Sequence, residues 1–205
     1  MSVQGVDVSA YQQTIDYKAL AATPFGGFVF AKATEGTDYT DDYFRANHNG
    51  AKAAGIPFGA YHFLHFGQDP IAQAQAFLAA IDGYEGTLLP MVDVESGGLD
   101  GVTNLDTLIA GLSMFLKTVE ATLGGKRCII YSDWNDWNTM MGGTSDFSGH
   151  PFWIAAYNND AAPPIPNGVV TWVLWQYTSG GTVNGIPGFV DCDLLNGNDT
   201  GVISR

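Results

Sequence analysis

Apolar runs and amphipathic segments alternate through the first two-thirds of the chain. Short, nearly continuous apolar runs are typical of buried strands, and they predict strands at residues 3–8, 28–32, 58–63 and 88–94. The segments between and after them predict helices at residues 16–22, 42–54, 70–81 and 104–123. Gly55 and Pro57 end the second of these helices, and Pro70 begins the third. The fourth helix carries an apolar stripe of the kind that packs on a core.

The pattern changes after residue 123, where strands follow one another with little helix between them. Apolar and aromatic runs predict four more strands at residues 127–131, 152–157, 172–177 and 189–194, separated by loops rich in Gly, Asn and Pro. Alternating strands and helices imply right-handed crossovers between parallel strands. Eight strands at this spacing can close into a barrel. The sequence therefore predicts a single-domain α/β barrel whose second half has lost most of its helices.

Composition and charge narrow the range of partners. The chain has 205 residues, 46% of them hydrophobic, which is enough for one substantial core. Its formal net charge is −13 and no basic stripe is present to neutralise phosphates, so no nucleic-acid partner is expected. No apolar run approaches about 18 residues, so no membrane span is expected. No signal peptide is visible in the first residues, which predicts either a different export route or a signal already removed.

The chain contains two cysteines, Cys128 and Cys192, in two different predicted strands. Two cysteines do not make a disulfide framework. One disulfide and two free buried thiols both fit the sequence, so the pairing stays open at this point.

The strand expected at residues 88–94 runs into two acids, Asp93 and Glu95. Side chains two apart on a strand share a face, about 6.5–7 Å from each other along the chain. Buried carboxyls are costly unless they are paired or used, and two this close raise the pKa of one toward neutral pH. Cleavage of a glycosidic bond needs such a pair, one acid to protonate the leaving oxygen and one anion to support the developing positive charge.

Polar or aromatic residues stand at the end of almost every predicted strand. In a parallel barrel these ends gather on one rim, where the sites of barrel enzymes form. Sugar rings stack on Trp and Tyr, and Asp, Gln and Tyr bind sugar hydroxyls, so this rim predicts a saccharide groove. A plain core role is the alternative for Trp153 and Trp175. The strand-end residues are Asp7, Lys32, Glu35, Tyr61, His62, Asp93, Glu95, Tyr131, Trp153, Tyr157, Trp175, Gln176 and Asp191.

Eight short motifs, in order from about residue 4 to residue 197, resemble those of glycoside hydrolase family 25, the Chalaropsis-type lysozymes or N-acetylmuramidases. The motifs are Gly5-Val6-Asp7-Val8-Ser9 with Tyr11-Gln12, Phe30-Ala31-Lys32-Ala33-Thr34-Glu35-Gly36, Gly59-Ala60-Tyr61-His62-Phe63, Asp93-Val94-Glu95, Ile130-Tyr131-Ser132, Phe152-Trp153-Ile154-Ala155-Ala156-Tyr157, Trp175-Gln176-Tyr177 and Val190-Asp191-Cys192-Asp193-Leu194-Leu195-Asn196-Gly197. The resemblance implies a modified TIM-like (β/α)5(β)3 barrel and one glycoside hydrolase catalytic domain over residues 1–205. It also implies cleavage of the β-1,4 bond between N-acetylmuramic acid and N-acetylglucosamine in bacterial cell-wall peptidoglycan.

The four acidic site positions of this family fall on Asp7, Asp93, Glu95 and Asp191. Asp193 would share the strand face of Asp191, but Asp191 occupies the first acidic place of the matching motif. We expect substrate contacts along the same rim, and neither a cofactor nor a metal. The expected contacts are Tyr61, Tyr131, Trp153, Tyr157, Trp175, Gln176, Lys32, Glu35, Phe63 and Asp193. For Lys32 and Glu35 a structural ion pair fits equally well.

Glu95 is the expected general acid, because burial and three neighbouring acids should raise its pKa. Asp93 has two candidate roles. It attacks the anomeric carbon directly, as in the ordinary retaining mechanism, or it orients the 2-acetamido group of the substrate, which then attacks. The spacing of the two acids resembles that in other acetamido-sugar hydrolases, which favours the second role by analogy. Asp7 and Asp191 are expected to hold and tune this pair.

Three other functions are weighed against a muramidase. A chitinase-like hydrolase would carry a longer Asp-rich run in place of Pro90-Met91-Val92. A non-catalytic barrel that binds cell-wall glycan is hard to reconcile with a complete set of acids. A metal hydrolase built on Asp7, His62 and Asp93 lacks a His-x-x-x-His-type spacing. We expect a monomer that is extracellular or acts on the cell wall, as a mature secreted form, a phage endolysin or a protein exported by another route.

Overall fold

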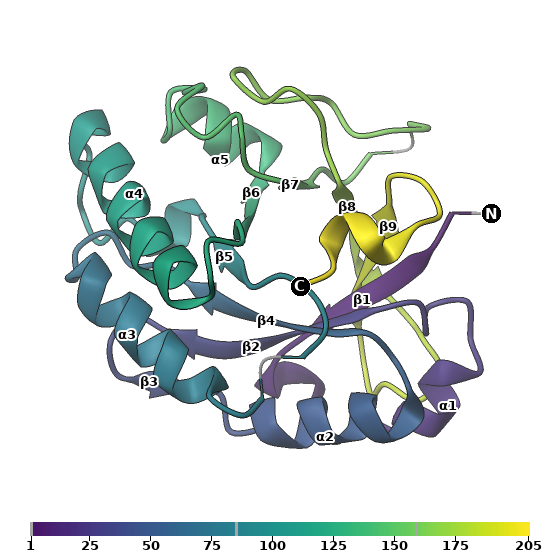
Figure 1. The fold of residues 1–205 in the computed structure, drawn as a ribbon. Coiled ribbons are helices and arrows are strands. Elements are labelled where there is room, and N and C mark those ends of the chain that lie inside the picture. The colour runs from purple at the N-terminus through teal and green to yellow at the C-terminus, as the bar shows by residue number, and fades with distance from the viewer. Residues whose placement is uncertain (1, 85, 159) are drawn as a thin grey trace.

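The computed structural model describes residues 2–84, 86–158 and 160–205, and its centre is a closed barrel (Figure 1). Eight strands of the described chain pair in the order β1, β2, β4, β5, β6, β7, β8, β9, and β9 pairs with β1 to close the ring. A further short strand, β3 (Tyr39–Thr40), pairs with β2 outside the ring. The barrel strands are β1 (Gln4–Val8), β2 (Val29–Glu35), β4 (Phe58–Phe63), β5 (Met91–Asp93), β6 (Ile129–Asp133), β7 (Phe152–Ala155), β8 (Leu174–Gly181) and β9 (Val190–Leu195).

The last strand of the barrel runs against the others. The pairs from β1 round to β8 are parallel, whereas β9 is antiparallel to both β8 and β1. The expectation of a wholly parallel barrel is therefore wrong for β9. Because β9 is reversed, its first residues lie beside the carboxyl ends of the other strands. Asp191, the second residue of β9, is paired in register with Asp7 of β1.

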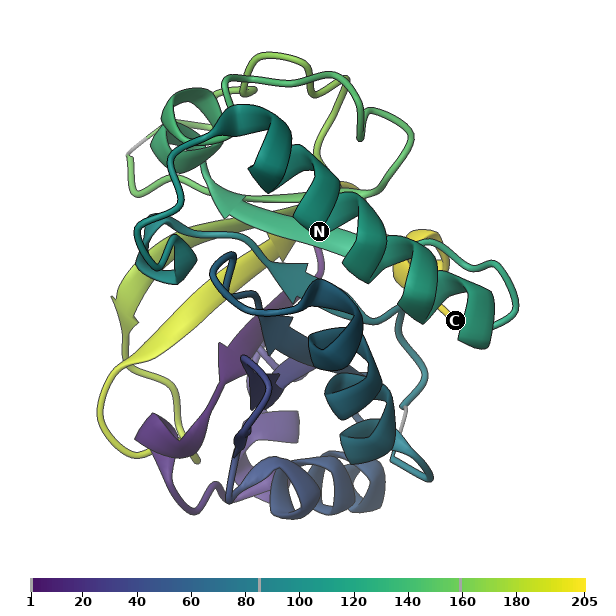
Figure 2. The same cartoon turned by 90° about the vertical axis from the view of Figure 1, so that its left-hand side faces the viewer.

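Helices cover the outside of the barrel, as Figures 1 and 2 show for α2, α3 and α4. An α-helix follows each of β1, β2 with its β3 hairpin, β4, β5 and β6, whereas the described residues after β7 contain only the short 3₁₀ helix η3. The (β/α)5(β)3 architecture is thereby confirmed. The helices are α1 (Tyr17–Ala21), α2 (Phe44–Ala54), α3 (Pro70–Ile81), α4 (Leu105–Thr122) and α5 (Trp134–Thr139), with 3₁₀ helices η1 (Ala10–Gln12), η2 (Ser96–Gly98) and η3 (Thr200–Ile203).

Local sequence sets the ends of these helices. The Asp69 side chain accepts the backbone N–H groups of Ile71 and Ala72 at 2.8 and 3.2 Å, and Pro70 occupies the first helical position. Both features favour a helix start, so α3 begins where the sequence predicts. Gly55 ends α2 with a φ of 72°, a left-handed conformation that glycine adopts without a steric penalty.

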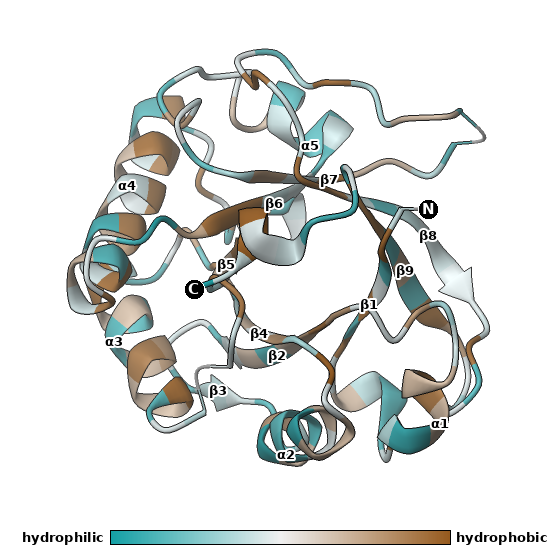
Figure 3. Ribbon diagram, turned by 45° about the vertical axis from the view of Figure 1, so that its right-hand side comes forward, coloured by the Kyte–Doolittle hydropathy of each residue, from teal (hydrophilic) through white to brown (hydrophobic). Residues whose placement is uncertain are grey.

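Side chains of the barrel strands alternate between two cores. The outward side chains are mostly Val, Ile and Ala and pack against the helices, whose mixed apolar and polar colouring is visible in Figure 3. The inward side chains are larger and fill the barrel. Gly59 leaves room for them, because a Cβ at this position would collide with the ring of Phe30. The inward residues include Phe28, Phe30, Tyr61, Met91, Ile129, Tyr131, Trp153 and Leu174.

The last segment of the chain closes the amino-terminal end of the barrel. Ile203 of η3 is fully buried with Leu88 and Leu89 among the inward residues. The backbone N–H of Leu89 donates to the carbonyl of Ile203 at 2.8 Å. Figure 1 shows this segment in yellow, with the C-terminus near the middle of the barrel. A ligand therefore reaches the barrel from the opposite end, where the carboxyl ends of β1 to β8 lie.

The structure also corrects or decides three smaller expectations. β5 is shorter than expected because Leu88 pairs with Ser204 instead of extending the strand. Cys128 and Cys192 are both free and buried, so the disulfide alternative is wrong. Within the described ranges, no helix combines the length and apolar character that a membrane crossing requires.

Candidate active site

A cavity of about 220 Å³ lies at the open end of the barrel, and the four predicted acids all line it. They are Asp7, Asp93, Glu95 and Asp191. A larger hollow of about 420 Å³ lies beside α2, around Ile56, and its described lining contains no carboxylate. The smaller cavity gathers four carboxylates and is therefore the candidate active site, which we call the acid cavity.

Two pairs of acids line the acid cavity, one from β1 and β9 and the other from the end of β5 and the residues that follow it. Asp7 and Asp191 face each other across β1 and β9. Asp93 ends β5, and Glu95 follows two residues later and lines the same cavity. Asp7 and Asp93 are 7% and 8% exposed, whereas Glu95 and Asp191 are half-buried. The structure thus gathers the four acids, with two of them deep in the cavity and two nearer its opening.

Burial raises the pKa of each acid in this cluster, and repulsion from neighbouring carboxylates adds to it for Asp7, Asp93 and Glu95. For Asp7 burial is the main cause, followed by the charge of Asp191, and for Asp93 burial is followed by the charge of Glu95. Burial also raises the pKa of Glu95, although the Tyr131 hydroxyl lowers it in part. For Asp191 burial raises the pKa to about 6. Four carboxyls this close do not all stay charged, so the cluster holds at least one proton near neutral pH.

Gln176 connects Asp7 to two tyrosines. Its Oε1 accepts the hydroxyls of Tyr131 and Tyr157 at 2.9 and 2.6 Å, and its Nε2 donates to Asp7 Oδ2 at 2.6 Å. Two hydroxyl donors face one end of the amide, so that end is the carbonyl oxygen. The other end is therefore the NH2 group, which donates to Asp7. This hydrogen bond favours the charged form of Asp7 and lowers its pKa against the effect of burial.

Asp93 lines the acid cavity, and one of its carboxylate oxygens has no hydrogen-bond partner among the described residues. This oxygen, Oδ1, is buried. Tyr61 lines the same cavity, and burial followed by the charges of Asp7 and Asp93 raises its pKa well above the usual range, so it stays a neutral hydroxyl. A buried carboxylate oxygen without a donor is costly. This unpartnered oxygen therefore adds to the cost of charging Asp93 and favours its neutral form.

Lys32 supplies a cation at the wall of the acid cavity. Its ammonium pairs with Glu35 and lies 4.9 Å from the centroid of the Phe63 ring. Its charge favours the anionic form of Asp93, against the effect of burial. Glu35 itself lies next door, in a hollow of about 460 Å³ that Tyr39 also lines. The expected Lys32–Glu35 ion pair is present, and Lys32 is its member inside the cavity.

Trp153 and Trp175 do not reach the acid cavity, so the expectation that they contact substrate is wrong. Trp153 is fully buried inside the barrel, with its ring centroid 5.6 Å from that of Tyr131. Trp175 precedes Gln176 in β8 and therefore points to the opposite face of the strand. There its indole N–H donates to the carbonyl of Ala156 at 2.9 Å. Both tryptophans are core residues, which was the alternative open in the sequence.

Asp193 lies inside the barrel, below the acid cavity. It is 0% exposed, and burial followed by the charges of Asp7 and Asp191 raises its pKa well above the usual range. Because β9 is reversed, the step from Asp191 to Asp193 leads away from the open end. Asp193 therefore does not line the acid cavity, contrary to the expected substrate contact, and burial favours the neutral form of its carboxyl.

The turn after β1 lines the cavity, although its residues were quoted only as part of the first motif and not expected as substrate contacts. Ser9, Tyr11 and Gln12 line the acid cavity beside the acids. Ser9 Oγ accepts the Tyr11 N–H at 3.3 Å, and the Gln12 side chain accepts the Ser9 N–H at 2.9 Å. This reciprocal capping fixes the turn before any ligand binds. The Ser-x-x-Gln spacing was the signal that could have revealed it.

The residues of the metal-hydrolase alternative point in different directions. His62 faces outward from β4, stacks on Phe115 at 4.8 Å between centroids and bonds Gln73 at 3.2 Å, whereas Asp7 and Asp93 face inward. Burial lowers the pKa of His62 to about 4. In the described parts of the chain, no group of three or more His, Cys, Asp or Glu side chains could hold a metal ion. These three residues therefore do not form a shared ligand set.

Comparison with known proteins places this geometry in a family. The model for glycosyl hydrolases family 25 matches residues 6–186. "Lysozyme M1" of Streptomyces globisporus is 34% identical over 204 residues, which are 96% of this chain and 68% of that protein. The "N,O-diacetylmuramidase" of Chalaropsis sp is 34% identical over 205 residues, 93% of this chain and 96% of that protein. The bacterial lysozyme structure from Streptomyces coelicolor matches with a TM-score of 0.87 and 32% identity, covering 98% of this chain and 95% of that one.

Proposed function

Because the chain belongs to the glycosyl hydrolases of family 25, we propose that it is a muramidase that hydrolyses bacterial peptidoglycan. The bond cut is the β-1,4 linkage between N-acetylmuramic acid and N-acetylglucosamine, with retention of configuration. One observation carries the proposal, namely four carboxyls with raised pKa values in a single cavity. Such a cluster supplies both the proton and the anion that glycosidic cleavage needs. We assign the activity to one catalytic domain, residues 1–205.

Glu95 is the general acid in this proposal. Burial raises its pKa, and Asp136 and Asp133 raise it further. A carboxyl with a raised pKa keeps its proton at the pH where the enzyme works. Glu95 is also less buried than Asp93 and one methylene longer, so it reaches further toward a glycosidic oxygen in the cavity.

Asp93 orients the 2-acetamido group of the substrate in this proposal. Asp93 lines the acid cavity, where its carboxylate can accept the amide N–H of that group. Burial followed by the charge of Glu95 raises the pKa of Asp93, so the anion that accepts this hydrogen bond forms when Glu95 holds the proton of the pair, and Lys32 favours that state. Direct attack by Asp93 on the anomeric carbon is the competing role, and it would require no acetamido group. Cleavage of a substrate that lacks the acetamido group would therefore contradict our assignment.

The proton and the electron pairs can be followed through both steps. The Glu95 proton moves to the glycosidic oxygen as its bond to C1 breaks, and the acetamido oxygen attacks C1 to form a cyclic oxazolinium ion. The Asp93 carboxylate offsets the positive charge of this ion. Glu95, now a carboxylate, removes a proton from the water that attacks C1 and opens the ring. Two displacements at C1 leave the original configuration.

The remaining groups of the acid cavity position these two acids and the sugar. Asp7 and Asp191 add negative charge that keeps the shared proton in the cluster. The hydroxyls of Tyr61, Tyr131 and Tyr157 face the cavity as hydrogen-bond partners for sugar hydroxyls. The neighbouring hollow, with the exposed rings of Tyr11 and Tyr39, would take the next sugar of a glycan strand.

Glu95→Gln tests the assignment of the general acid. Gln keeps the size of Glu but has no proton to give, and a general acid contributes about 10²–10⁴-fold to rate. We expect a loss of that size in the release of reducing ends from purified peptidoglycan. Wild-type activity should in turn fall as pH rises through the raised pKa of Glu95.

Glu120→Gln is the matched control for this variant. Glu120 lies on α4, where it pairs with His150 at 3.0 Å and caps the N–H of Cys128, so its loss should leave turnover unchanged. Near-normal turnover in the Glu95→Gln variant would contradict our assignment. Release of reducing ends from chitin but not from peptidoglycan would favour the chitinase alternative. Binding of peptidoglycan without any release of reducing ends would favour the non-catalytic alternative.

We propose that the enzyme acts on the cell wall outside the cytoplasm, as a monomer. The peptidoglycan substrate proposed above lies there, which supports this location. Size-exclusion chromatography with light scattering tests the oligomeric state, and a dimer mass would contradict it.

A further inference from the structure

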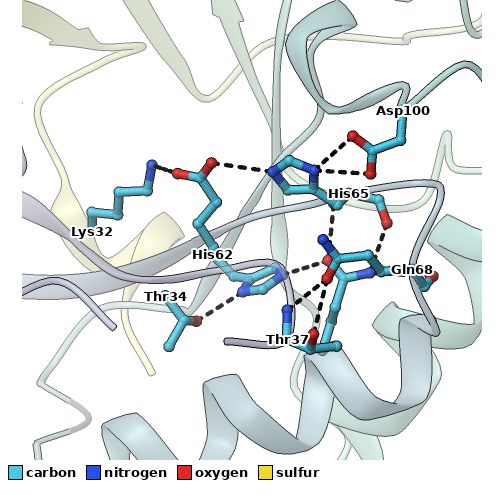
Figure 4. A network of polar contacts seen from close by, with 9 residues as sticks. Lys32, Thr34, Thr37, His62, His65, Gln68 and Asp100 are labelled. Carbon is cyan, nitrogen blue, oxygen red and sulfur yellow. Dashed lines mark hydrogen bonds and ion pairs between the residues drawn. The ribbon is translucent and has the colours of Figure 1, made fainter. Parts of the chain in front are cut away.

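We propose that His65 is a positioning residue that acts through Glu35 to hold Lys32 at the wall of the acid cavity. The imidazole of His65 also contacts Asp100, which lies in the segment that follows Glu95. Figure 4 shows these side chains as one connected row of polar contacts. The proposal rests on the muramidase function proposed above, because part of its test is the rate of glycan cleavage.

Both ring nitrogens of His65 face carboxylates. Nε2 lies 3.1 Å from Glu35 Oε1, and Nδ1 lies 2.9 Å from Asp100 Oδ2. A neutral imidazole has one N–H and one lone pair, so one of these contacts would set lone pair against lone pair. The imidazolium form donates to both. The two carboxylates correspondingly raise the pKa of His65, although burial alone would lower it.

Glu35 is held by cations on both of its oxygens. Lys32 pairs with one oxygen and His65 with the other. The lysine ammonium sits on a flexible four-carbon stem. Because His65 holds the far oxygen of Glu35, the carboxylate restricts the positions that this ammonium can take. Lys32 and His65 together lower the pKa of Glu35, although burial acts in the other direction. The result is a row of alternating charges, from Lys32 through Glu35 and His65 to Asp100.

One end of this row is part of the acid cavity. Lys32 lines the cavity together with Asp93, and its positive charge favours the anionic form of Asp93. Moving the ammonium away would raise the pKa of Asp93 further. It would thereby remove the anion that the proposed mechanism uses.

The other end of the row lies in the segment after Glu95. Asp100 has a φ of 50°, a conformation that residues with a side chain adopt rarely and at a cost. The neighbouring Phe66 N–H donates to the carbonyl of Gly98 at 2.7 Å. The contact from His65 to Asp100 adds a charged link to this junction. The row therefore joins the ends of β2 and β4 to the segment that follows the general acid.

The charges that face His65 come from two elements beside its own. Glu35 and Lys32 face it from β2, and Asp100 faces it from the segment after η2. His62 is close to it on β4 and is neutral, because burial lowers the pKa of His62 to about 4. Since the folded pKa of His65 is raised, its stabilisation is complete below about pH 6.5 and is lost as pH rises through the folded pKa.

The test uses His65→Gln and His65→Arg, each alone and combined with Lys32→Met. Gln keeps a donor without charge, whereas Arg keeps the charge and offers donors to both carboxylates. Coupled sites interact by roughly 2- to 100-fold, and we expect His65→Gln to lower kcat/KM by about 10-fold at pH 6. We expect His65→Arg to restore activity to within about threefold of wild type. On the Lys32→Met background, His65→Gln should change kcat/KM by less than about twofold.

His150→Gln is the matched control. His150 also pairs with a carboxylate, Glu120, at 3.0 Å, but far from the acid cavity, so its loss should leave kcat/KM unchanged. The second readout is the urea midpoint of unfolding between pH 5.5 and pH 9. The destabilisation of His65→Gln relative to wild type should shrink as pH rises, while His65→Arg should show no such trend.

Each outcome decides a separate part of the proposal. Equal losses of kcat/KM with and without Lys32, or a His65→Arg variant as impaired as His65→Gln, would overturn the positioning role. A destabilisation that does not change with pH would overturn the imidazolium bridge. If the wild type releases no reducing ends, the proposed function fails, and the unfolding comparison then decides the bridge by itself.

Discussion

Gln176→Leu would remove the amide that joins Asp7, Tyr131 and Tyr157 while keeping a side chain of similar length. Asp7 is 7% exposed, so it would cost about 1–3 kcal/mol when left without its donor, whereas the Tyr131 hydroxyl keeps Glu95 as a hydrogen-bond partner. Tyr157 is 57% exposed, and water replaces its contact. The expected loss in the free energy of unfolding is therefore about 1–3 kcal/mol, a substantial part of the about 5–15 kcal/mol typical of a domain.

Gln176→Glu keeps the shape and both acceptor contacts but places an oxygen where the amide donor faces Asp7. The two carboxyls would then share a proton over the present 2.6 Å contact. The pKa of Asp7 would rise as well, because the donor that lowers it is lost. A Glu has a pKa of about 4.3 in the unfolded chain. If its pKa is higher in the folded state, it destabilises the fold above that pH, by up to about 1.4 kcal/mol for each unit by which the pKa is raised. The penalty relative to wild type should therefore be small at pH 4 and grow toward pH 7.

Urea unfolding followed by tryptophan fluorescence at pH 4, 5.5 and 7 measures both variants against wild type. Tyr157→Phe is the control, since it removes one exposed hydroxyl and should cost less than about 1 kcal/mol. A Gln176→Glu variant as stable as wild type at pH 7 would refute the reasoning. It would mean that the Gln176 amide does not hold the buried charge of Asp7.

Two further predictions concern the rim and the floor of the acid cavity. Tyr11→Ala should raise KM for peptidoglycan by about 2- to 10-fold with little change in kcat, because an exposed ring stacks on sugar without touching the reacting bond. Initial-rate kinetics check this, and a fall in kcat at constant KM would contradict it. Asp193→Asn should raise the urea midpoint at pH 7 but not at pH 4, because the buried acid takes up a proton on folding above its unfolded pKa. A lower midpoint for this variant at pH 7 would speak against a neutral, destabilising carboxyl.

Elements with strong local signals are predictable from the sequence. α3 spans the residues expected for it, 70–81, because Asp69 and Pro70 encode its start locally. α5 was missed, since its six residues bury one side chain, Trp137, and form no apolar stripe. β5 is shorter than expected because Leu88 pairs with Ser204, a contact with the far end of the chain that no local window reveals. Local patterns therefore give the type of an element, and tertiary pairing decides where it ends.

The direction of β9 explains why the site was only partly predictable. The sequence indicates that Asp191 and Asp193 share a face, and both do turn toward the barrel interior. Which of them reaches the open end depends on strand direction, and direction is not encoded in a two-residue spacing. The same limit applies to His65, whose partners Glu35 and Asp100 lie 30 and 35 residues away. Residue types at strand ends thus indicate the chemistry, whereas the pKa of each group follows from neighbours that closure of the barrel brings together.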